Sequence, residues 1–176
     1  MQHKIGIFLT GGTIDSYNKP ELDGLAVPLK ESLVKKYIES LQLPYETVFI
    51  QICLKDSQEL TDNDKEQLIK EIERCGMQHN IVTHGTYTML DTARYLFNKG
   101  VGKDKVVVVT GSMSTLLGSI YESGFLRPSD AQFNLGYAIG ETFNLDNGVY
   151  QAMDGETFKQ PDQEWCHDAD GAHRKK

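Results

Sequence analysis

Cysteine is scarce in this sequence, and its spacing matches no cysteine-dependent site. Cys53, Cys75 and Cys166 are the only cysteines, and none belongs to a CxxC pair. Any disulfide scheme would leave one of them unpaired, which excludes the small disulfide-stapled secreted folds and suits a reducing compartment. We interpret all three cysteines as structural.

Long apolar runs are also missing. No stretch approaches the length needed to cross a bilayer, and residues 1–4 lead directly into a strand-like segment rather than into a secretory signal. We therefore expect a cytoplasmic protein without a membrane partner.

Positive charge shows no excess that would suit a nucleic acid. The formal net charge is −7 at pH 7, and basic residues are interspersed with acidic ones up to a short basic run at residues 174–176. Because phosphate binding needs clustered lysine and arginine, we expect no nucleic-acid partner.

The composition that remains is that of an ordinary globular protein. Hydrophobic residues make up 39% of the 176 positions and charged residues 24%. A chain of this length suits one domain with a buried core. We expect this domain over residues 1–155, followed by polar surface chain without clear periodicity over residues 156–176.

Strand-like and helix-like segments alternate five times. Such alternation predicts parallel strands joined by right-handed crossovers with helices on both faces. The fold class expected is therefore α/β, with a doubly wound, mostly parallel open sheet in three layers, of the Rossmann or flavodoxin-like type. The expected strands are residues 4–10, 46–52, 80–85 (which run into a turn), 105–111 and 147–153, and the expected helices begin near Pro28, Thr61, Thr86 and Ser129.

Four loops with glycine or serine follow the expected strands. They read "TGGT", "KDSQ", "THGT" and "TGSM". Ligands of open α/β sheets bind beyond the carboxyl ends of the strands, where all four loops fall. The topology thus predicts a ligand pocket at this edge.

Two of these loops share one pattern, in which a strand is followed by glycine and then threonine. Gly12 precedes Thr13, and Gly85 precedes Thr86. Glycine lets the backbone turn sharply and approach a ligand, and free amides at the start of a helix can hold an anion. We expect the two threonines to face one small ligand.

The two motifs together resemble a known pair. "LTGGTID" and "VTHGTYTMLDTA" are similar to the signature motifs of the bacterial-type L-asparaginase and glutaminase family. The resemblance extends to "DSQEL", "VTGSM" and "SDAQFNL" and covers roughly residues 4–142. It implies an amidohydrolase that acts on the side-chain amide of a small amino acid or a related amide.

The resemblance also implies catalytic roles. Thr13 would attack the amide and form an acyl-enzyme, which water then hydrolyses. Thr86 would belong to a second hydroxyl group near the substrate carbonyl. Tyr17 matches the mobile-loop tyrosine beside the nucleophile.

Binding roles follow from the same resemblance. Ser57 and Gln58 would bind the α-carboxylate of the substrate. Backbone amides around Gly12, Thr86 and Ser112 would hold the oxyanion, and Gly85 lies in the second motif. No cofactor and no metal are implied.

The sequence departs from the family pattern in three respects. Tyr87 stands where the family has an aspartate that binds the substrate ammonium, and Asp91 is a candidate substitute. A neutral phenol cannot match a charge-assisted hydrogen bond. Lys159 is the nearest candidate for the family's relay lysine. The family's second, smaller domain is not expected in this chain.

Other interpretations stay open. Tyr87 favours a catalytically impaired module that binds a small amino acid or anion in the same pocket. A nucleotide site ranks below these, because "TGGTID" is not GxGxxG. His84 is interpreted as a packing residue rather than a base, and the terminal Cys166, His167, Asp168 and His173 as solvated rather than metal-binding. A homo-oligomer is expected, with the helix that contains "FNL" as a candidate interface.

Overall fold

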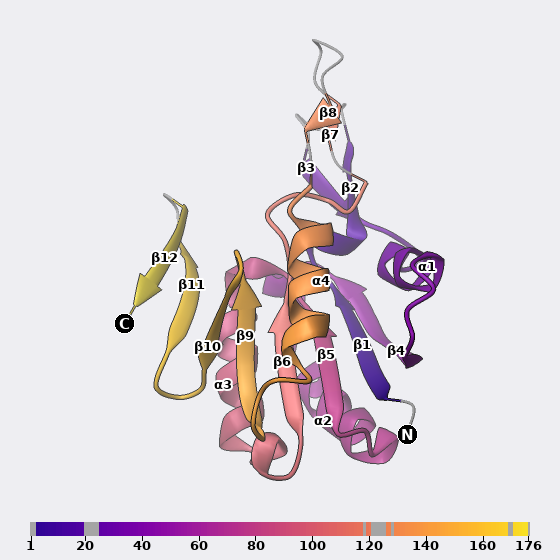
Figure 1. The fold of residues 1–176 in the computed structure, drawn as a ribbon. Helices are drawn as coiled ribbons and strands as arrows, with labels where there is room; N and C mark the ends of the chain where they lie inside the picture. Colours follow the sequence, from indigo (N-terminus) through magenta and orange to yellow (C-terminus); the bar gives the residue numbers. More distant parts are fainter. Residues whose placement is uncertain are drawn as a thin grey trace.

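A mostly parallel sheet of six strands, in the order β10-β9-β6-β5-β1-β4, forms the centre of the part of the chain that the structure describes (Figure 1). This computed structural model describes residues 3–19, 25–117, 119–120, 126–127, 129–168 and 171–175. β10 runs antiparallel beside β9, and the other neighbours are parallel. The strands are β1 (Lys4–Gly11), β4 (Glu46–Lys55), β5 (His79–Thr83), β6 (Val106–Thr110), β9 (Gly148–Met153) and β10 (Glu156–Lys159).

The strand order identifies the place in the sheet where a ligand is expected. The parallel strands stand side by side as β4-β1-β5-β6-β9, so the second strand along the chain flanks the first, and the later strands follow on the other side. This is the flavodoxin-like order, in which the direction of winding reverses between β1 and β5. The predicted fold class is confirmed, and the crevice at the reversal is the topological switch point.

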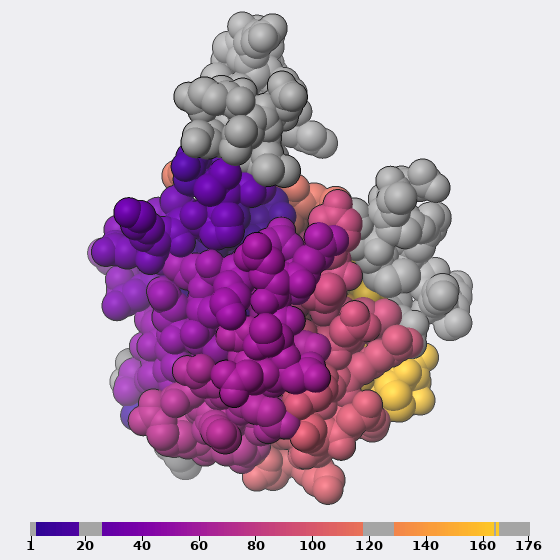
Figure 2. Space-filling model, turned by 180° about the vertical axis from the view of Figure 1, so that it is seen from behind, coloured from indigo at the N-terminus to yellow at the C-terminus, as the bar shows by residue number. Residues whose placement is uncertain are grey.

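Helices cover both faces of the sheet. α1 (Leu33–Ser40) and α4 (Ala131–Glu141) pack over one face, and α4 crosses in front of the strands in Figure 1. α2 (Asp62–Cys75) and α3 (Met89–Asn98) pack over the other face, which Figure 2 shows from behind. The chain therefore forms three layers.

The central strands are apolar on both sides because both faces are covered. In β6, Val106 and Val108 pack on the α4 side, and Val107 and Val109 pack on the side of α2 and α3. All four valines are at most 1% exposed. A strand buried on both faces reads as a continuous apolar run, which is why its position could be predicted.

One crossover has the opposite hand to the prediction. β6 and β9 follow β5 in the same direction across the sheet, yet α3 and α4 lie on opposite faces. The β6–α4–β9 connection is therefore left-handed, and the expectation of right-handed crossovers throughout is wrong (Figure 1). The loop after β6 already lies on this face before α4 begins, because the N–H of Leu116 donates to the carbonyl of Ile14 and the Leu116 side chain joins the core on the α1 side.

The first helix begins later than expected. Pro28 does not open it, but ends β3 (Leu25–Pro28), which forms an antiparallel hairpin with β2 (Ser16–Lys19). α1 starts only at Leu33, whose N–H donates to the carboxylate of Asp15. The helix start depends on this contact between distant segments, which periodicity does not reveal.

The second helix has the ends that the sequence predicts. The Thr61 hydroxyl accepts from the N–H of Asp64, and the Asp64 carboxylate accepts from the N–H of Thr61, which completes a capping box. Gly76 ends the helix in the left-handed conformation, with φ of 64°.

Short segments complete the described chain. None of the described helices is long and apolar enough to cross a membrane. The short segments are η1 (Thr13–Asp15), η3 (Ser57–Glu59), η4 (Thr86–Thr88), η5 (Val101–Lys103), the pair β7 (Ser119–Ile120) and β8 (Leu126–Arg127), and the hairpin of β11 (Glu164–Asp168) with β12 (Gly171–Lys175).

The chain after residue 155 is more ordered than the sequence indicates. β10 joins the main sheet, and Phe158 and Trp165 are buried in the core on the side of α2 and α3. Gln151 of β9 holds Trp165 at both main-chain groups, because its Nε2 donates to the Trp165 carbonyl (2.9 Å) and its Oε1 accepts from the Trp165 N–H (3.1 Å). The expectation of irregular surface chain from Glu156 onward is wrong for these residues.

Candidate active site

The end of β1 bends sharply at two glycines. Gly11 has φ of 97° and Gly12 has φ of 85°, values that side-chain-bearing residues rarely adopt. The N–H of Gly12 donates to the carbonyl of Lys55 at the end of β4 (2.8 Å). Thr13 then opens the short turn η1 and is half-buried.

The end of β5 touches this bend. A methyl group placed on Gly12 would lie 2.3 Å from the nitrogen and 2.4 Å from the Cα of Gly85. The two backbones are therefore in contact, so Thr13 and Thr86 follow from neighbouring strand ends at the switch point. Thr86 is 4% exposed and starts η4. The structure brings together the two motifs that the sequence singled out.

Ser57, in the turn that follows β4, also lies at the contact of Gly12 with Gly85. A methyl group on Gly85 would lie 2.7 Å from the Ser57 Oγ, so the Ser57 side chain lies directly beside Gly85. Ser57 is 2% exposed, and its hydroxyl has no hydrogen-bond partner among the described residues. Gln58 beside it is exposed, and its N–H donates to the Asp56 carboxylate (2.8 Å).

Ser112 lies at the end of β6 with its hydroxyl already engaged. It is fully buried, and its Oγ donates to the carbonyl of Ser114 (2.5 Å). The N–H groups of Met113 and Ser114 donate to the carboxylate of Asp130. This loop is thus held by its own contacts, and the backbone rather than the hydroxyl of Ser112 is the group suited to a ligand.

The two tyrosines lie nearer the surface. Tyr17 is 37% exposed on β2 and lines a cavity of about 600 Å³ together with Val27, Pro28 and Leu29. Tyr87 is 57% exposed on η4.

Lys159 lies at the other edge of the sheet. It lines a cavity of about 300 Å³ with Gly148, the first residue of β9, and its Nζ stands over the Tyr150 ring at 5.5 Å. The amino ends of the parallel strands form this edge, so the suggestion of Lys159 as a relay lysine is wrong. The side chains of Cys166, His167, Asp168 and His173 lie outside those that the structure describes.

His84 directly follows the end of β5. It is fully buried, its Nδ1 donates to the Gly85 carbonyl (2.8 Å), and its Nε2 accepts from the Thr92 hydroxyl (2.8 Å). Burial lowers its pKa to about 4, although the hydrogen bond to Gly85 opposes this shift. The neutral ring with both nitrogens bonded agrees with its interpretation as a packing residue.

The low pKa of His84 predicts a loss of stability in weak acid. The unfolded chain takes up a proton near pH 6.5, whereas the folded chain resists protonation until about pH 4. Stability is therefore complete above pH 6.5 and falls by up to about 1.4 kcal/mol for each pH unit between these values. Urea unfolding across this range measures the slope, and His84→Gln is expected to flatten it.

Asp64 provides the internal comparison. Burial raises its pKa, but hydrogen bonds from Lys55 and Thr61 outweigh this effect and lower the pKa to about 2. Its contribution to stability is lost only below its ordinary value of 3.8, outside the range assigned to His84. Equal slopes for the wild type and His84→Gln between pH 6.5 and 4 would contradict the assignment.

Asp15 is a residue of the site region to which the sequence analysis gave no role. It closes the turn that Thr13 opens, and it is fully buried. Burial raises the pKa of its carboxyl, while hydrogen bonds from Ser32, Val34 and Leu33 act in the opposite direction. The signal that could have revealed it is an acidic residue three positions after the glycine pair, ahead of a helix that lacks an acidic residue in its first turn.

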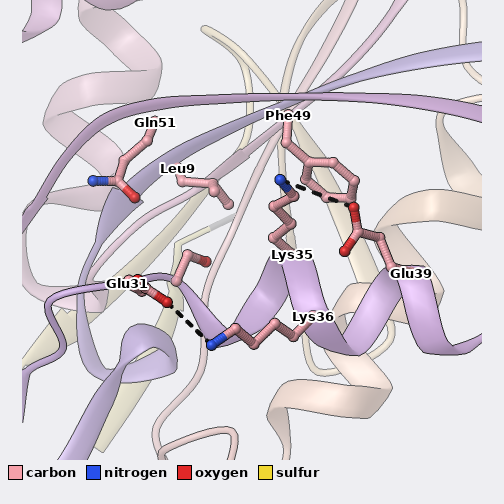
Figure 3. Close-up of a pocket in the computed structure, with 8 residues that line it drawn as sticks. Leu9, Glu31, Lys35, Lys36, Glu39, Phe49 and Gln51 are labelled. Atoms are coloured by element: carbon pink, nitrogen blue, oxygen red, sulfur yellow. Dashed lines mark hydrogen bonds and ion pairs between the residues drawn. The ribbon is translucent and has the colours of Figure 1, made fainter.

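A cavity of about 450 Å³ lies beside this region, between α1 and the edge formed by β1 and β4 (Figure 3). Leu9 and Phe49 are its apolar residues. Ion pairs of Lys36 with Glu31 and of Lys35 with Glu39 border it.

Known proteins share this architecture. The family model for the N-terminal domain of asparaginases matches residues 4–160. No sequence among the curated proteins matches the chain.

Three solved structures are similar in fold. L-asparaginase I from Vibrio cholerae O1 biovar eltor has a TM-score of 0.76 and 23% identity, over 99% of this chain and 51% of that one. The thermostable L-asparaginase from Thermococcus kodakarensis has a TM-score of 0.70 and 20% identity, over 97% and 51%. A probable cytoplasmic L-asparaginase from Campylobacter jejuni has a TM-score of 0.69 and 23% identity, over 97% and 51%. The chain spans about half the length of these proteins.

Proposed function

This chain belongs to the asparaginase family through the N-terminal domain that residues 4–160 match, and from this membership we propose that it is an amidohydrolase. Its substrate would be the side-chain amide of a small amino acid or a related small amide, with Thr13 as the nucleophile. The observation that supports this most is the backbone contact of Gly12 with Gly85, because it joins the two threonine-bearing turns at the switch point.

The proposed chemistry has two steps. The Thr13 hydroxyl attacks the amide carbon and gives up its proton, and the tetrahedral intermediate collapses with protonation and release of ammonia. Water then attacks the resulting threonyl ester, which releases the carboxylic acid and restores the hydroxyl. The Thr86 hydroxyl is proposed as a second polar group at the carbonyl.

Groups at the neighbouring strand ends would bind the substrate. The buried Ser57 hydroxyl has no partner among the described side chains and main-chain groups, so a ligand carboxylate would satisfy it. The N–H of Gly12 is already used by Lys55, so the proposed oxyanion donors are the amides of Thr86 and Ser112. Tyr17, on the strand that follows the Thr13 turn, is proposed as a catalytic residue beside the nucleophile.

Replacement of Thr13 tests the nucleophile. Thr13→Val keeps the shape of the side chain but removes the hydroxyl, so ammonia release is expected to fall at least about 10³-fold. Thr13→Ser retains a hydroxyl and is expected to keep measurable turnover. The assay measures ammonia from asparagine, glutamine and analogues without the amino group, with circular dichroism as the folding control.

Two outcomes would contradict the proposal. If Thr13→Val releases ammonia at the wild-type rate, Thr13 is not the nucleophile. If the folded wild-type chain hydrolyses none of the amides, hydrolysis itself is rejected.

Tyr87 favours a second candidate function, a module that binds a small amino acid or anion without turnover. A tyrosine side chain cannot give an ammonium group the charge-assisted hydrogen bond that a carboxylate gives. Asp91, in the first turn of α3, is the nearest acidic substitute in sequence. Saturable heat of binding for aspartate or asparagine, without ammonia release, would support the module over the enzyme.

Assembly and location are parts of the same proposal. We propose a homo-oligomer through α4, on which Phe133 is 59% exposed although it is a large apolar residue. We also propose a cytoplasmic location.

A further inference from the structure

Asp15 makes an unusual set of contacts for a residue in the turn that carries Thr13. Its Oδ1 accepts from the N–H groups of Leu33 (2.8 Å) and Val34 (3.3 Å), and its Oδ2 accepts from the hydroxyl of Ser32 (2.7 Å). These donors are the first residues of α1, which lies far along the chain. The carboxylate therefore caps a helix from another segment.

α1 depends on this cap because its own residues do not supply one. Ser32 occupies the N-cap position but makes no side-chain hydrogen bond to the helix backbone, and no acidic residue lies in the first turn. The Asp15 carboxylate satisfies two orphan N–H groups and places negative charge at the positive end of the helix.

The main chain of Asp15 ties the same residue to the Thr13 turn. Its N–H donates to the Gly12 carbonyl (3.1 Å), and its carbonyl accepts from the N–H of Leu29 (3.0 Å). One buried residue thus connects the glycine bend, the segment before α1 and α1 itself. Any shift of the helix start must move the turn that carries Thr13.

On the side of α1 that faces β4, a cavity adjoins the start of the helix. The cavity of about 450 Å³ lies between Ser32 and Lys35 of this region and Gln51 of β4 (Figure 3). On this side, side chains do not fill the space between the helix and the strand. On the inner side, Ile14 of the turn shares a core cluster with Val34 and Ile38 of α1, and the bonds of Asp15 add the polar link between turn and helix start.

We propose that Asp15 is a positioning residue, whose carboxylate holds the turn of Thr13 against the start of α1 and so fixes the Thr13 hydroxyl for reaction. This inference rests on the proposed function. A displacement of about 1 Å at a reacting group can lower a rate about 10²-fold, so the effect should appear in kcat rather than in KM.

Three substitutions test the geometry in the full chain. Asp15→Ala removes all three bonds, and Asp15→Glu keeps the charge but lengthens the link by one methylene. Both are expected to lower kcat at least about tenfold with KM changed less than about twofold. Asp15→Asn keeps an acceptor for the two N–H groups and gains a donor for Ser32, so it is expected to retain kcat within about threefold.

Val101→Ala is the matched control for stability. Val101 is 2% exposed and lies in η5, away from the carboxyl ends of the strands, so its truncation destabilises the core without touching the turn. It should lower the melting temperature and leave kcat unchanged. Wild-type kcat for Asp15→Glu, or equal losses for Asp15→Ala and Val101→Ala, would overturn the proposal.

A second measurement separates this proposal from the proposed function. Amide hydrogen exchange of residues 12–17 reports the turn without any turnover. Asp15→Ala is expected to accelerate this exchange at least about tenfold over Val101→Ala, because the turn loses its attachment to the helix. If the wild type is inactive on every amide, the proposed function fails, and unchanged exchange in Asp15→Ala overturns the positioning role by itself.

Discussion

Gly12→Ala is expected to lower the free energy of unfolding by about 4 kcal/mol or more, which is enough to unfold most of a marginally stable domain. Gly12 combines φ of 85° with ψ of −175°, a region of backbone conformation that is essentially restricted to glycine. The added methyl would also lie 2.3 Å from the Gly85 nitrogen. Neither strand end can retreat, because Gly12 is bonded to Lys55 and His84 N–H is bonded to the Thr110 carbonyl.

Two other glycines separate conformational strain from close approach. Gly76 has φ of 64° but no atom within 4 Å of an added methyl, so Gly76→Ala isolates the strain and is expected to cost about 1 kcal/mol. Gly136 is exposed in α4 with equally open space, and Gly136→Ala is expected to stabilise the protein by about 0.5–1 kcal/mol.

Urea unfolding of the three alanine variants measures how their free energies of unfolding differ. An unfolding midpoint of Gly12→Ala equal to that of Gly76→Ala would show that the close approach to Gly85 adds no cost at Gly12. The contact between the ends of β1 and β5 would then be absent, and with it the geometry on which the proposed site depends.

The sheet and the convergence of its loops could be predicted because they depend on local signals. The four valines of β6 indicate a strand covered on both faces, and glycine before Thr13 and Thr86 indicates sharp turns that approach one another. The carboxyl edge then follows from parallel topology, since all these turns leave the sheet on one side. The roles of the site residues stay predictions that the experiments above test.

The features that the sequence did not indicate depend on contacts between distant segments. Pro28 ends a strand because the hairpin with β2 continues to it, and α1 begins where Asp15 reaches it. The left-handed connection to β9 accompanies packing of Leu116 and α4 on the α1 side, where Leu116 also bonds to Ile14. Lys159 looked near the site by its position in the chain, but β10 runs antiparallel and takes it to the other edge.

Trp165→Ala is expected to cost about 3–5 kcal/mol, the range for truncation of a large aromatic side chain in a core. Trp165 is 1% exposed and packs in the cluster that contains Met89, Leu96 and Phe158. The truncation leaves a large void among these side chains, and the Gln151 side chain, which bonds both main-chain groups of residue 165, would lose a rigid partner.

Phe97→Ala is the matched control, because Phe97 is 39% exposed on α3 and its loss is expected to cost less than about 1 kcal/mol. Circular dichroism in urea follows both variants. A loss near 4 kcal/mol for Trp165→Ala means that the folded unit extends past residue 155, since a side chain outside the domain cannot carry that much of its stability. A loss as small as that of Phe97→Ala would mean that the segment after β10 contributes little to stability, contrary to the burial of Trp165 in the core.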